Sequence, residues 1–328
     1  MGAVELENLR KTFTLTQGWG RSRKQTEVVA VDDITLSIPD GQAIAFIGPN
    51  GAGKSTTIKM LTGILYPTSG YASLLGLNPW KNRRKLAYQI GVVFGQRSQL
   101  WYHLPPRDTL ELLARIYNID RQEYLKRRDV LVERFDLRPF WHTPVRKLSL
   151  GQRMRAEVAA SLLHTPRLLF LDEPTIGLDV IARQELRGLI REWNRNEGVT
   201  VFLTSHDAGD IEQVAQRVVV INHGRVVLDD KISAMRRDYL GAKVLSVRFH
   251  DTTGQIILPG VTELKKTEYA LKLEVNTRIT PIEKVMTHIL QAGSVADIAI
   301  EDPPLEEVIA HIYSQAAPSQ GVQTGCTI

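Results

Sequence analysis

Residues 42–56 read QAIAFIGPNGAGKST: a short apolar run, a glycine-rich loop and the start of a helical stretch. Positions 48–55 match the pattern G-x-x-x-x-G-K-[ST], which marks a phosphate-binding loop when it follows a buried strand and opens a helix. Glycines let the backbone wrap closely around a phosphate, and N–H groups at the helix start bind it. In this interpretation Lys54 reaches the β- and γ-phosphates, and the Ser55 hydroxyl can ligate Mg²⁺. The alternative, a purely structural turn, leaves Lys54 and Ser55 in register unexplained. The residues predicted to bind the nucleotide here are Gly48, Pro49, Asn50, Gly51, Ala52, Gly53, Lys54, Ser55 and Thr56.

Acidic residues follow a second apolar run, in RLLFLDEPTIGLD (167–179). Asp172 and Glu173 close this predicted strand, and ligands of open α/β sheets bind beyond the carboxyl ends of the strands. Asp172 suits a magnesium shell, while the neighbouring Glu173 points elsewhere and can act as general base toward a water. Gln96 and His206 also follow apolar runs. Each alone is more often a structural polar residue, but their shared position at strand ends indicates a site.

A third motif lies at residues 147–160, KLSLGQRMRAEVAA. Ser149 and Gly151 precede a long run of helix formers, and the first turn lacks the acidic residue that a helix dipole favours. An open helix N-terminus beside a glycine is a possible anion site. The simpler alternative is an ordinary serine N-cap.

Composition sets broad limits. The 328 residues are 43% hydrophobic and 23% charged, which is typical of one large or two smaller globular domains. The net charge of +5 and pI of about 9.2 fit a nucleotide ligand, nucleic acid or an anionic membrane surface without choosing among them. The one cysteine, Cys326, cannot staple a fold and favours a reducing cytoplasm. No apolar window is long enough to span a bilayer, so any membrane role is expected to be peripheral.

The pattern of elements predicts an α/β fold with a mainly parallel sheet. Predicted strands occupy 28–38, 42–47, 90–94, 168–172, 199–204 and 218–222, and predicted helices occupy 54–62, 108–117, 121–136, 150–164 and 180–196. The helices at 108–136 come without a strand between them, which indicates a helical insertion. A polar loop at 16–27 interrupts the first hairpin.

The domain prediction places residues 1–240 in one domain, with a helical subdomain at about 97–163. Residues 241–316 follow as a small α+β accessory domain, with strands at 243–250, 268–275 and 295–300 and helices at 281–292 and after Pro304. The polar segment 317–328 is predicted to be a flexible tail.

The order of the motifs resembles the ATPase subunit of ABC transporters over about residues 1–230. This resemblance implies an α/β P-loop NTPase fold with an antiparallel N-terminal β part and a helical subdomain. It also implies ATP and Mg²⁺ as cofactors. LSLGQ resembles the signature that, in this family, binds the γ-phosphate of ATP held by the other subunit. Ser149, Gly151, Gln152 and Asp179 would therefore contact ATP in trans, although Leu150 stands where the commonest signature has glycine.

The resemblance also implies individual roles. Gln96 would be the glutamine that senses magnesium and water, Glu173 the catalytic base and His206 the γ-phosphate histidine. Phe13 would stack on adenine. It lies 35 residues before Gly48, a longer gap than is usual, so Trp19 stays an alternative. No catalytic residue is missing, which predicts an active ATPase.

The whole chain looks most like single-domain ATPases of export-type ABC systems. The implied partners are membrane permease subunits and a second ATPase subunit, with a homodimer expected, at the cytoplasmic face of the membrane; no nucleic acid is expected. A soluble ABC ATPase outside transport and an importer ATPase are the alternatives. The segment RSQLWYHLPP (97–106) is predicted to present Leu100, Trp101, Tyr102 and Leu104 to the permease. The alternative is that these side chains fold back on the helical insertion.

Overall fold

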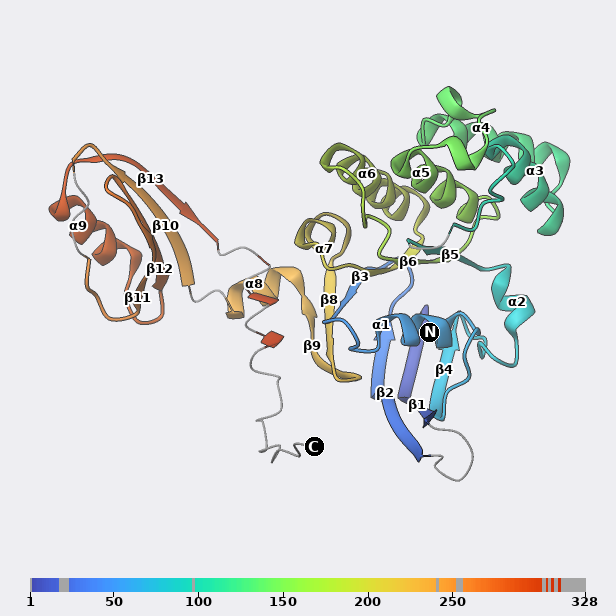
Figure 1. Cartoon of the computed structure of the whole chain (residues 1–328), viewed down its shortest axis with the longest axis horizontal. Helices are drawn as coiled ribbons and strands as arrows, with labels where there is room; N and C mark the ends of the chain where they lie inside the picture. Colours follow the sequence, from blue (N-terminus) through green and yellow to red (C-terminus); the bar gives the residue numbers. More distant parts are fainter. Residues whose placement is uncertain are drawn as a thin grey trace. The chain divides into compact units, whose positions relative to one another are not determined.

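The computed structural model describes residues 2–17, 24–95, 98–239, 242–251 and 256–302, with residues 305, 308–309 and 312–313 of the C-terminal part. The chain divides into two compact units, Met1–Asp230 and Lys231–Ile328 (Figure 1). The division falls ten residues before the predicted boundary at residue 240. A helix at Ile232–Tyr239 (α8), which the sequence analysis left in the first domain, belongs to the second unit.

A six-stranded sheet forms the centre of the first unit, in the order β5-β6-β7-β3-β8-β9. The pairs β3–β7, β3–β8, β5–β6 and β6–β7 are parallel, as the alternating pattern predicted. Its strands are β3 (Ala43–Ile47), β5 (Ile90–Phe94), β6 (Leu168–Asp172), β7 (Thr200–Thr204), β8 (Arg217–Asn222) and β9 (Arg225–Lys231). The parallel strands β3, β6 and β7 therefore end at the same edge of the sheet.

A second, antiparallel sheet in the order β2-β1-β4 joins β1 (Val4–Gln17), β2 (Lys24–Ile38) and β4 (Ser69–Leu74). The predicted loop at 16–27 is too long, because Thr16 pairs with Gln25 and Gln17 pairs with Lys24. Thr16 and Thr26 favour strands although the segment is polar, and Val28 and Val29 continue β2 directly after it. Residues 18–23, Trp19 among them, lie outside the described part of the chain.

Four helices pack with the sheets: α1 (Lys54–Leu61), α2 (Arg83–Ala87), α6 (Val180–Glu197) and α7 (Ala208–Val214). The predicted helical insertion contains α3 (Pro106–Ile116), α4 (Arg121–Arg134) and α5 (Leu150–Ser161). Helix α3 begins two residues earlier than predicted, because a proline in the first turn loses no helical hydrogen bond.

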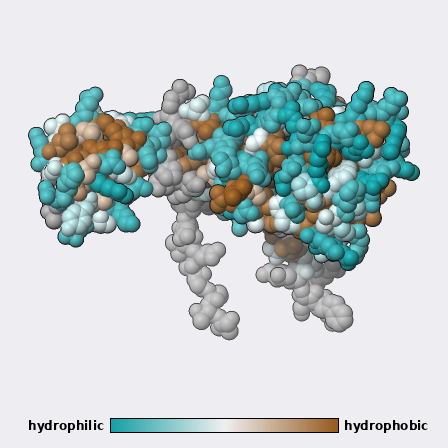
Figure 2. Space-filling model, turned by 90° about the horizontal axis from the view of Figure 1, so that it is seen from above, coloured by the Kyte–Doolittle hydropathy of each residue, from teal (hydrophilic) through white to brown (hydrophobic). Residues whose placement is uncertain are grey.

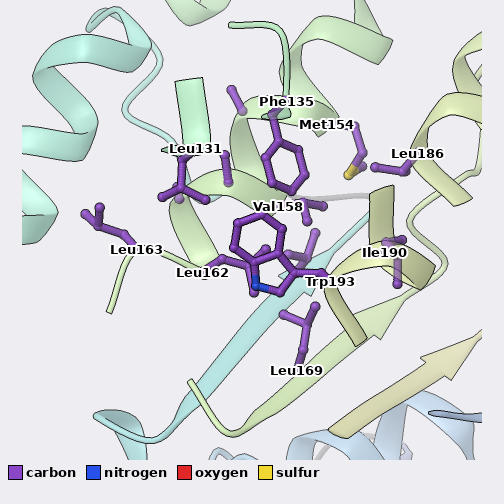
Figure 3. Packing of buried hydrophobic residues seen from close by; sticks show 14 of the residues in the cluster. Leu131, Phe135, Met154, Val158, Leu162, Leu163, Leu169, Leu186, Ile190 and Trp193 are labelled. Atoms are coloured by element: carbon purple, nitrogen blue, oxygen red, sulfur yellow. The ribbon is translucent and has the colours of Figure 1, made fainter. Parts of the chain in front are cut away.

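A large apolar core attaches these helices to the sheet (Figure 3). Phe135, which directly follows α4, and Trp193 of α6 pack with ring centroids 5.5 Å apart, next to Val158 of α5 and Leu169 of β6. Burying side chains of this size supplies much of the free energy of folding. The helix that follows Ser149 is thereby fixed on the strand that ends in Asp172.

A second apolar core supports the phosphate loop. Phe202 of β7 lies 5.1 Å from Phe46 of β3 and 5.4 Å from Phe170 of β6, measured between ring centroids. All three side chains are fully buried. Three neighbouring strands are therefore locked together just below the ends where the predicted site residues lie.

The second unit contains a four-stranded antiparallel sheet in the order β11-β12-β10-β13, with one long helix. The elements are β10 (Ala242–Phe249), β11 (Val261–Lys266), β12 (Ala270–Asn276), α9 (Ile282–Ala292) and β13 (Val295–Glu301). Val285 and Ile289 of α9 join the apolar side chains of one sheet face in a separate small core. Most of the predicted last helix and the whole tail at 317–328 lie outside the described residues.

Among the described residues, no helix combines the length and the apolar character needed to cross a membrane. Figure 2 shows hydrophilic residues over most of the visible surface, with hydrophobic residues in separate patches.

Candidate active site

The phosphate loop connects β3 to α1 and is shaped by close backbone contacts. Gly53 has φ of 105°, and a Cβ there would lie 2.4 Å from the Ala30 carbonyl oxygen. A Cβ on Gly48 would lie 2.3 Å from the Ile221 carbonyl oxygen. Neither position accepts a side chain, so these glycines allow the loop to pass close to β2 and β8.

Lys54 is buried in this loop, with its ammonium group held by backbone oxygens. Nζ donates hydrogen bonds to the carbonyls of Gly48 (2.6 Å) and Pro49 (3.2 Å). Burial lowers the pKa of Lys54, whereas the negative charges of Glu173 and Asp172 oppose that change. The Lys54 ammonium group is therefore held by backbone carbonyls beside two carboxylates, and a bound phosphate would be a further partner for it.

Asp172 and Glu173 point to different partners. At the end of β6, Asp172 Oδ1 accepts a hydrogen bond from Thr204 Oγ1 (2.6 Å) and lies 3.5 Å from Ser55 Oγ. Glu173 adopts a left-handed conformation with φ of 54°, and its N–H donates to the Thr204 carbonyl (3.0 Å). This turn separates the two carboxylates, so that each can do different chemistry.

The His206 ring lies between opposite charges. Its Nε2 is 3.0 Å from Lys54 Nζ and 3.0 Å from Glu173 Oε1. An unprotonated Nε2 accepts from the ammonium group, and a protonated Nε2 donates to the carboxylate, but one nitrogen cannot do both. The position of one proton therefore decides which neighbour His206 binds.

These residues surround a cavity of about 400 Å³. It is lined by Asn50, Gly51, Ala52, Gly53, Lys54, Ser55, Thr56, Glu173 and His206, all predicted from the sequence, and by Ala30 and Ile176, which were not. Ile176 lies in the segment TIGLD (175–179), in which only Asp179 was predicted to be a site residue. Asp172 contacts Ser55 behind the cavity, and Gly48 and Pro49 hold Lys54.

Phe13 is not among the described residues that line this cavity. Phe13 is half-buried on β1, where it pairs with Val28, and Lys11 Nζ lies 5.1 Å from its ring centroid. Gln96 lies outside the described residues. The four residues predicted to act in trans are absent from the described lining of this cavity.

The prediction that α5 begins with an open N-terminus is wrong for the single chain. The Gln152 N–H donates to Ser149 Oγ (3.2 Å), and the Ser149 N–H donates to Gln152 Oε1 (3.0 Å). This reciprocal pair is a capping box, which a glutamine three residues after the cap makes possible. Asp179 likewise caps α6 by accepting from the Ala182 N–H at 2.8 Å.

A buried polar network that was not predicted from the sequence lies behind the site. The carboxylate of Asp210, 1% exposed, accepts hydrogen bonds from Thr175 Oγ1, Ser205 Oγ and Arg187 Nε, each at 2.5 Å. Thr175 lies two residues after Glu173, and Ser205 directly precedes His206. One carboxylate thus ties the segment that contains Glu173 to the segment that contains His206.

Helix α6 also joins this network. Arg187 donates to Asp207 Oδ1 (2.7 Å), and Arg183 donates to Asp207 Oδ2 (2.8 Å). Burial tends to raise the pKa of Asp207, but the two arginines and the Gly209 N–H outweigh burial and lower it. Asp207 therefore stays ionised beside its arginines, which fixes the start of α7 on α6.

The family model described as "ABC transporter" matches residues 31–176. The bacitracin transport ATP-binding protein BcrA of Bacillus licheniformis is 34% identical over 238 residues, which cover 72% of this chain and 74% of BcrA. The chain belongs to the ABC transporter family.

Further ABC transporter proteins match over more of the chain. The daunorubicin resistance ATP-binding protein DrrA3 of Streptomyces coeruleorubidus is 31% identical, and the match covers 89% of this chain and 94% of DrrA3. A match of that length has to include part of the second unit. The dimeric post-hydrolysis structure of the ATP-binding cassette MJ0796 with ADP and Pi has a TM-score of 0.60 at 26% identity and covers 70% of this chain and 98% of MJ0796. The structure of cbiO1 from Clostridium perfringens has a TM-score of 0.61 at 28% identity and covers 72% of this chain and 94% of cbiO1.

The predicted family, the predicted fold class and the predicted enzyme activity are confirmed. This ABC transporter subunit binds ATP and is an ATPase whose reaction is coupled to transport.

Proposed function

We propose that two copies of this chain bind ATP and Mg²⁺ between them and hydrolyse the ATP to drive export by a separate membrane permease. The proposed location is the cytoplasmic face of the membrane. The observation that carries the proposal is the convergence of Lys54, Glu173 and His206 on one cavity at the ends of the parallel strands.

Phosphate binding follows from the loop. The N–H groups at the start of α1 and the Lys54 ammonium group neutralise the β- and γ-phosphates. Ser55 and Asp172 would hold Mg²⁺, because both present oxygen atoms at one place and Mg²⁺ takes few protein ligands beside phosphate oxygens. The ion supplies charge neutralisation on the phosphate oxygens.

Hydrolysis needs a base beside the γ-phosphate. Glu173 takes a proton from the attacking water as the water oxygen bonds to phosphorus and the bond to the bridging oxygen of ADP breaks. His206 Nε2, with its proton, would leave Glu173 and donate to a γ-phosphate oxygen. The left-handed turn at Glu173 supports this division, since it separates the base from the carboxylate that would hold the metal.

A second copy would complete the site. We assign four residues to the nucleotide bound by the partner chain: Ser149, Gly151, Gln152 and Asp179. They lie at the starts of α5 and α6, and none of them is in the described lining of their own chain's cavity. The dimeric cassette structure with ADP and Pi supports this arrangement.

Export is supported by the relatives that match most of the chain. Their names refer to bacitracin transport, daunorubicin resistance and lantibiotic transport. The match to DrrA3 includes part of the second unit, so the likeness to a resistance protein extends beyond the ATPase unit.

Replacing the base tests the proposal. Glu173→Gln is expected to keep ATP binding and to slow hydrolysis by roughly 10²–10⁴-fold, because the amide cannot accept the proton. The variant should also accumulate as an ATP-bound dimer in size-exclusion chromatography with light scattering. The exposed Glu7→Gln is the matched control and should behave as the wild type. A Glu173→Gln chain that stays monomeric with ATP and turns over at the wild-type rate would refute the assignment.

A further inference from the structure

The net positive charge of this chain comes from one stretch. Between Asp40 and Asp108, residues 41–107 contain eight Lys and Arg and no Asp or Glu. The remaining 261 residues contain 33 Lys and Arg and 36 Asp and Glu, and are therefore net negative. ATP binding explains only Lys54 among the eight, so the excess has another origin.

Four of these cations lie together at α2. Lys81, Arg83, Arg84 and Lys85 are all exposed, and none of them forms an ion pair within the described part of the chain. Figure 1 shows α2 at the outer edge of the first unit, in the connection between β4 and β5. Like charges without acidic partners repel one another, and this repulsion raises the free energy of the folded chain. A neighbouring acidic group would lower it.

Aromatic and apolar side chains adjoin these cations. Tyr66 is 66% exposed, with its ring centroid 6.4 Å from that of Trp80, and Ile64 is also exposed. Trp80 Nε1 donates to the Leu65 carbonyl (2.7 Å), and a Cβ on Gly63 would lie 3.3 Å from Arg83 Cγ. The turn at 63–66 and the start of α2 are thus packed together. We call Ile64, Tyr66, Lys81, Arg83, Arg84 and Lys85 the α2 patch.

We propose that the α2 patch binds the anionic headgroups of membrane lipids. Each Lys or Arg close to an anionic bilayer strengthens binding roughly fivefold. Tyrosine and tryptophan side chains favour the interface between headgroups and hydrocarbon. Exposed Ile64 and Tyr66 beside the charges favour a lipid surface over a purely polar polyanion. The inference rests on the proposed membrane location. It adds that the ATPase would contact the bilayer through the α2 patch as well as contacting its permease.

Vesicle sedimentation of the full chain tests this surface. The probes are vesicles of phosphatidylcholine alone and of phosphatidylcholine with 30% phosphatidylglycerol, at millimolar lipid and at 0.1 M and 0.5 M salt. Binding is expected only to the anionic vesicles and only at the lower salt concentration. The triple variant Arg83→Gln, Arg84→Gln, Lys85→Gln should bind on the order of 100-fold more weakly, the fold-change that three such contacts imply.

A charge-matched variant separates the patch from net charge. Arg248→Gln, Lys265→Gln, Lys284→Gln removes three exposed cations from the second unit and should bind vesicles as the wild type does. Equal binding by the two triple variants, or no binding of the wild type to anionic vesicles, would overturn the proposal. The proposal would also be overturned if the triple variant of Arg83, Arg84 and Lys85 bound vesicles normally but no longer co-purified with the permease. That result would assign the α2 patch to an acidic segment of the permease.

The ATPase assay keeps this result distinct from the proposed function. Both triple variants retain every residue that lines the nucleotide cavity, so both should hydrolyse ATP at the wild-type rate. A wild type that lacks ATPase activity would count against the proposed function, whereas an active wild type that ignores anionic vesicles counts only against the α2 patch.

Discussion

At the scale of single residues, Asp210 connects three parts of the site without lining the cavity. Its carboxylate accepts hydrogen bonds from Thr175, Ser205 and Arg187, which lie in three separate segments. A carboxylate can accept several bonds at once, whereas an asparagine amide offers one accepting oxygen and an NH₂ group that donates. Asp210 is therefore a positioning residue for Glu173 and His206, which adjoin those segments.

Asp210→Asn is expected to lower kcat about 10- to 100-fold and to leave the dissociation constant for ATP within about threefold of the wild type. The amide would repel the Thr175 or Ser205 hydroxyl donor and move the base relative to the histidine, while the phosphate loop stays intact. Steady-state kinetics with a nucleotide-binding assay separates these effects.

Asp229→Asn is the control for this change. Asp229 is also paired with an arginine, Arg217, through two hydrogen bonds, but that pair joins β8 to β9 and lies outside the site network. This variant should keep kcat. If both variants lose ATP affinity and stability alike and keep kcat, Asp210 has a purely structural role.

At the scale of elements, α5 has a buried ionisable side chain, that of Glu157. Glu157 is 4% exposed, its Oε2 has no hydrogen-bond partner in the described part of the chain, and Arg153 Nε lies 3.8 Å from its Oε1. Burial raises the pKa of Glu157 to about 7, against the opposing effects of the Ser98 hydroxyl and Arg153. Between its ordinary pKa near 4.5 and pH 7, the folded chain holds this proton more tightly than the unfolded chain does.

Stability should therefore fall as pH rises through that window and then level off. Glu157→Gln removes the buried charge, so it should raise the free energy of unfolding by roughly 2 kcal/mol more at pH 8 than at pH 5. Urea unfolding at both pH values measures this difference. The exposed Glu133→Gln on α4 serves as control and should show little change. An equal effect of Glu157→Gln at both pH values would show that Glu157 is ionised throughout.

At the scale of the whole molecule, the loop after β5 bears on how the ATPase meets its permease. The prediction that Leu100 is exposed is wrong, because Leu100 is 5% exposed and belongs to the core that also holds α3 and α5. Trp101 and Tyr102 remain exposed at 38% and 57%. The loop is fixed from below by Leu100 and by the Val145 and Arg146 N–H groups, which donate to the Leu104 and Tyr102 carbonyls.

Trp101→Glu is expected to weaken co-purification with the permease while basal ATPase activity stays near the wild-type value, since a charge would enter a contact that excludes water. Ile257→Glu makes a similar change at an 80% exposed apolar residue of the second unit and should leave co-purification unchanged. Normal co-purification and transport by the Trp101→Glu chain would exclude this loop from the interface.

The sequence predicted the parts of the site that depend on local order. Lys54, Asp172, Glu173 and His206 each follow an apolar strand, so their meeting at one sheet edge follows from topology. The Asp210 network was not predictable in this way, because its members lie on different segments and short motifs do not pair them. The α5 start was misinterpreted because Gln152 suits both a signature and a capping box.

The accessory domain proposed for residues 241–316 is supported by the separate small core of the second unit. Its first helix, α8, was not predicted, since eight residues between a strand and a domain boundary give a weak periodic signal.

The capping box of α5 affects how the proposed dimer would close. Ser149 uses an oxygen lone pair to cap the helix, so its hydroxyl hydrogen remains able to point at an incoming phosphate. The cap fixes the side chain in one rotamer before any partner arrives, and little rotamer entropy is then lost on docking. Closure around ATP would accordingly be a rigid-body encounter at this contact, with no helix end left to order, and its rate would be set by how the two chains meet.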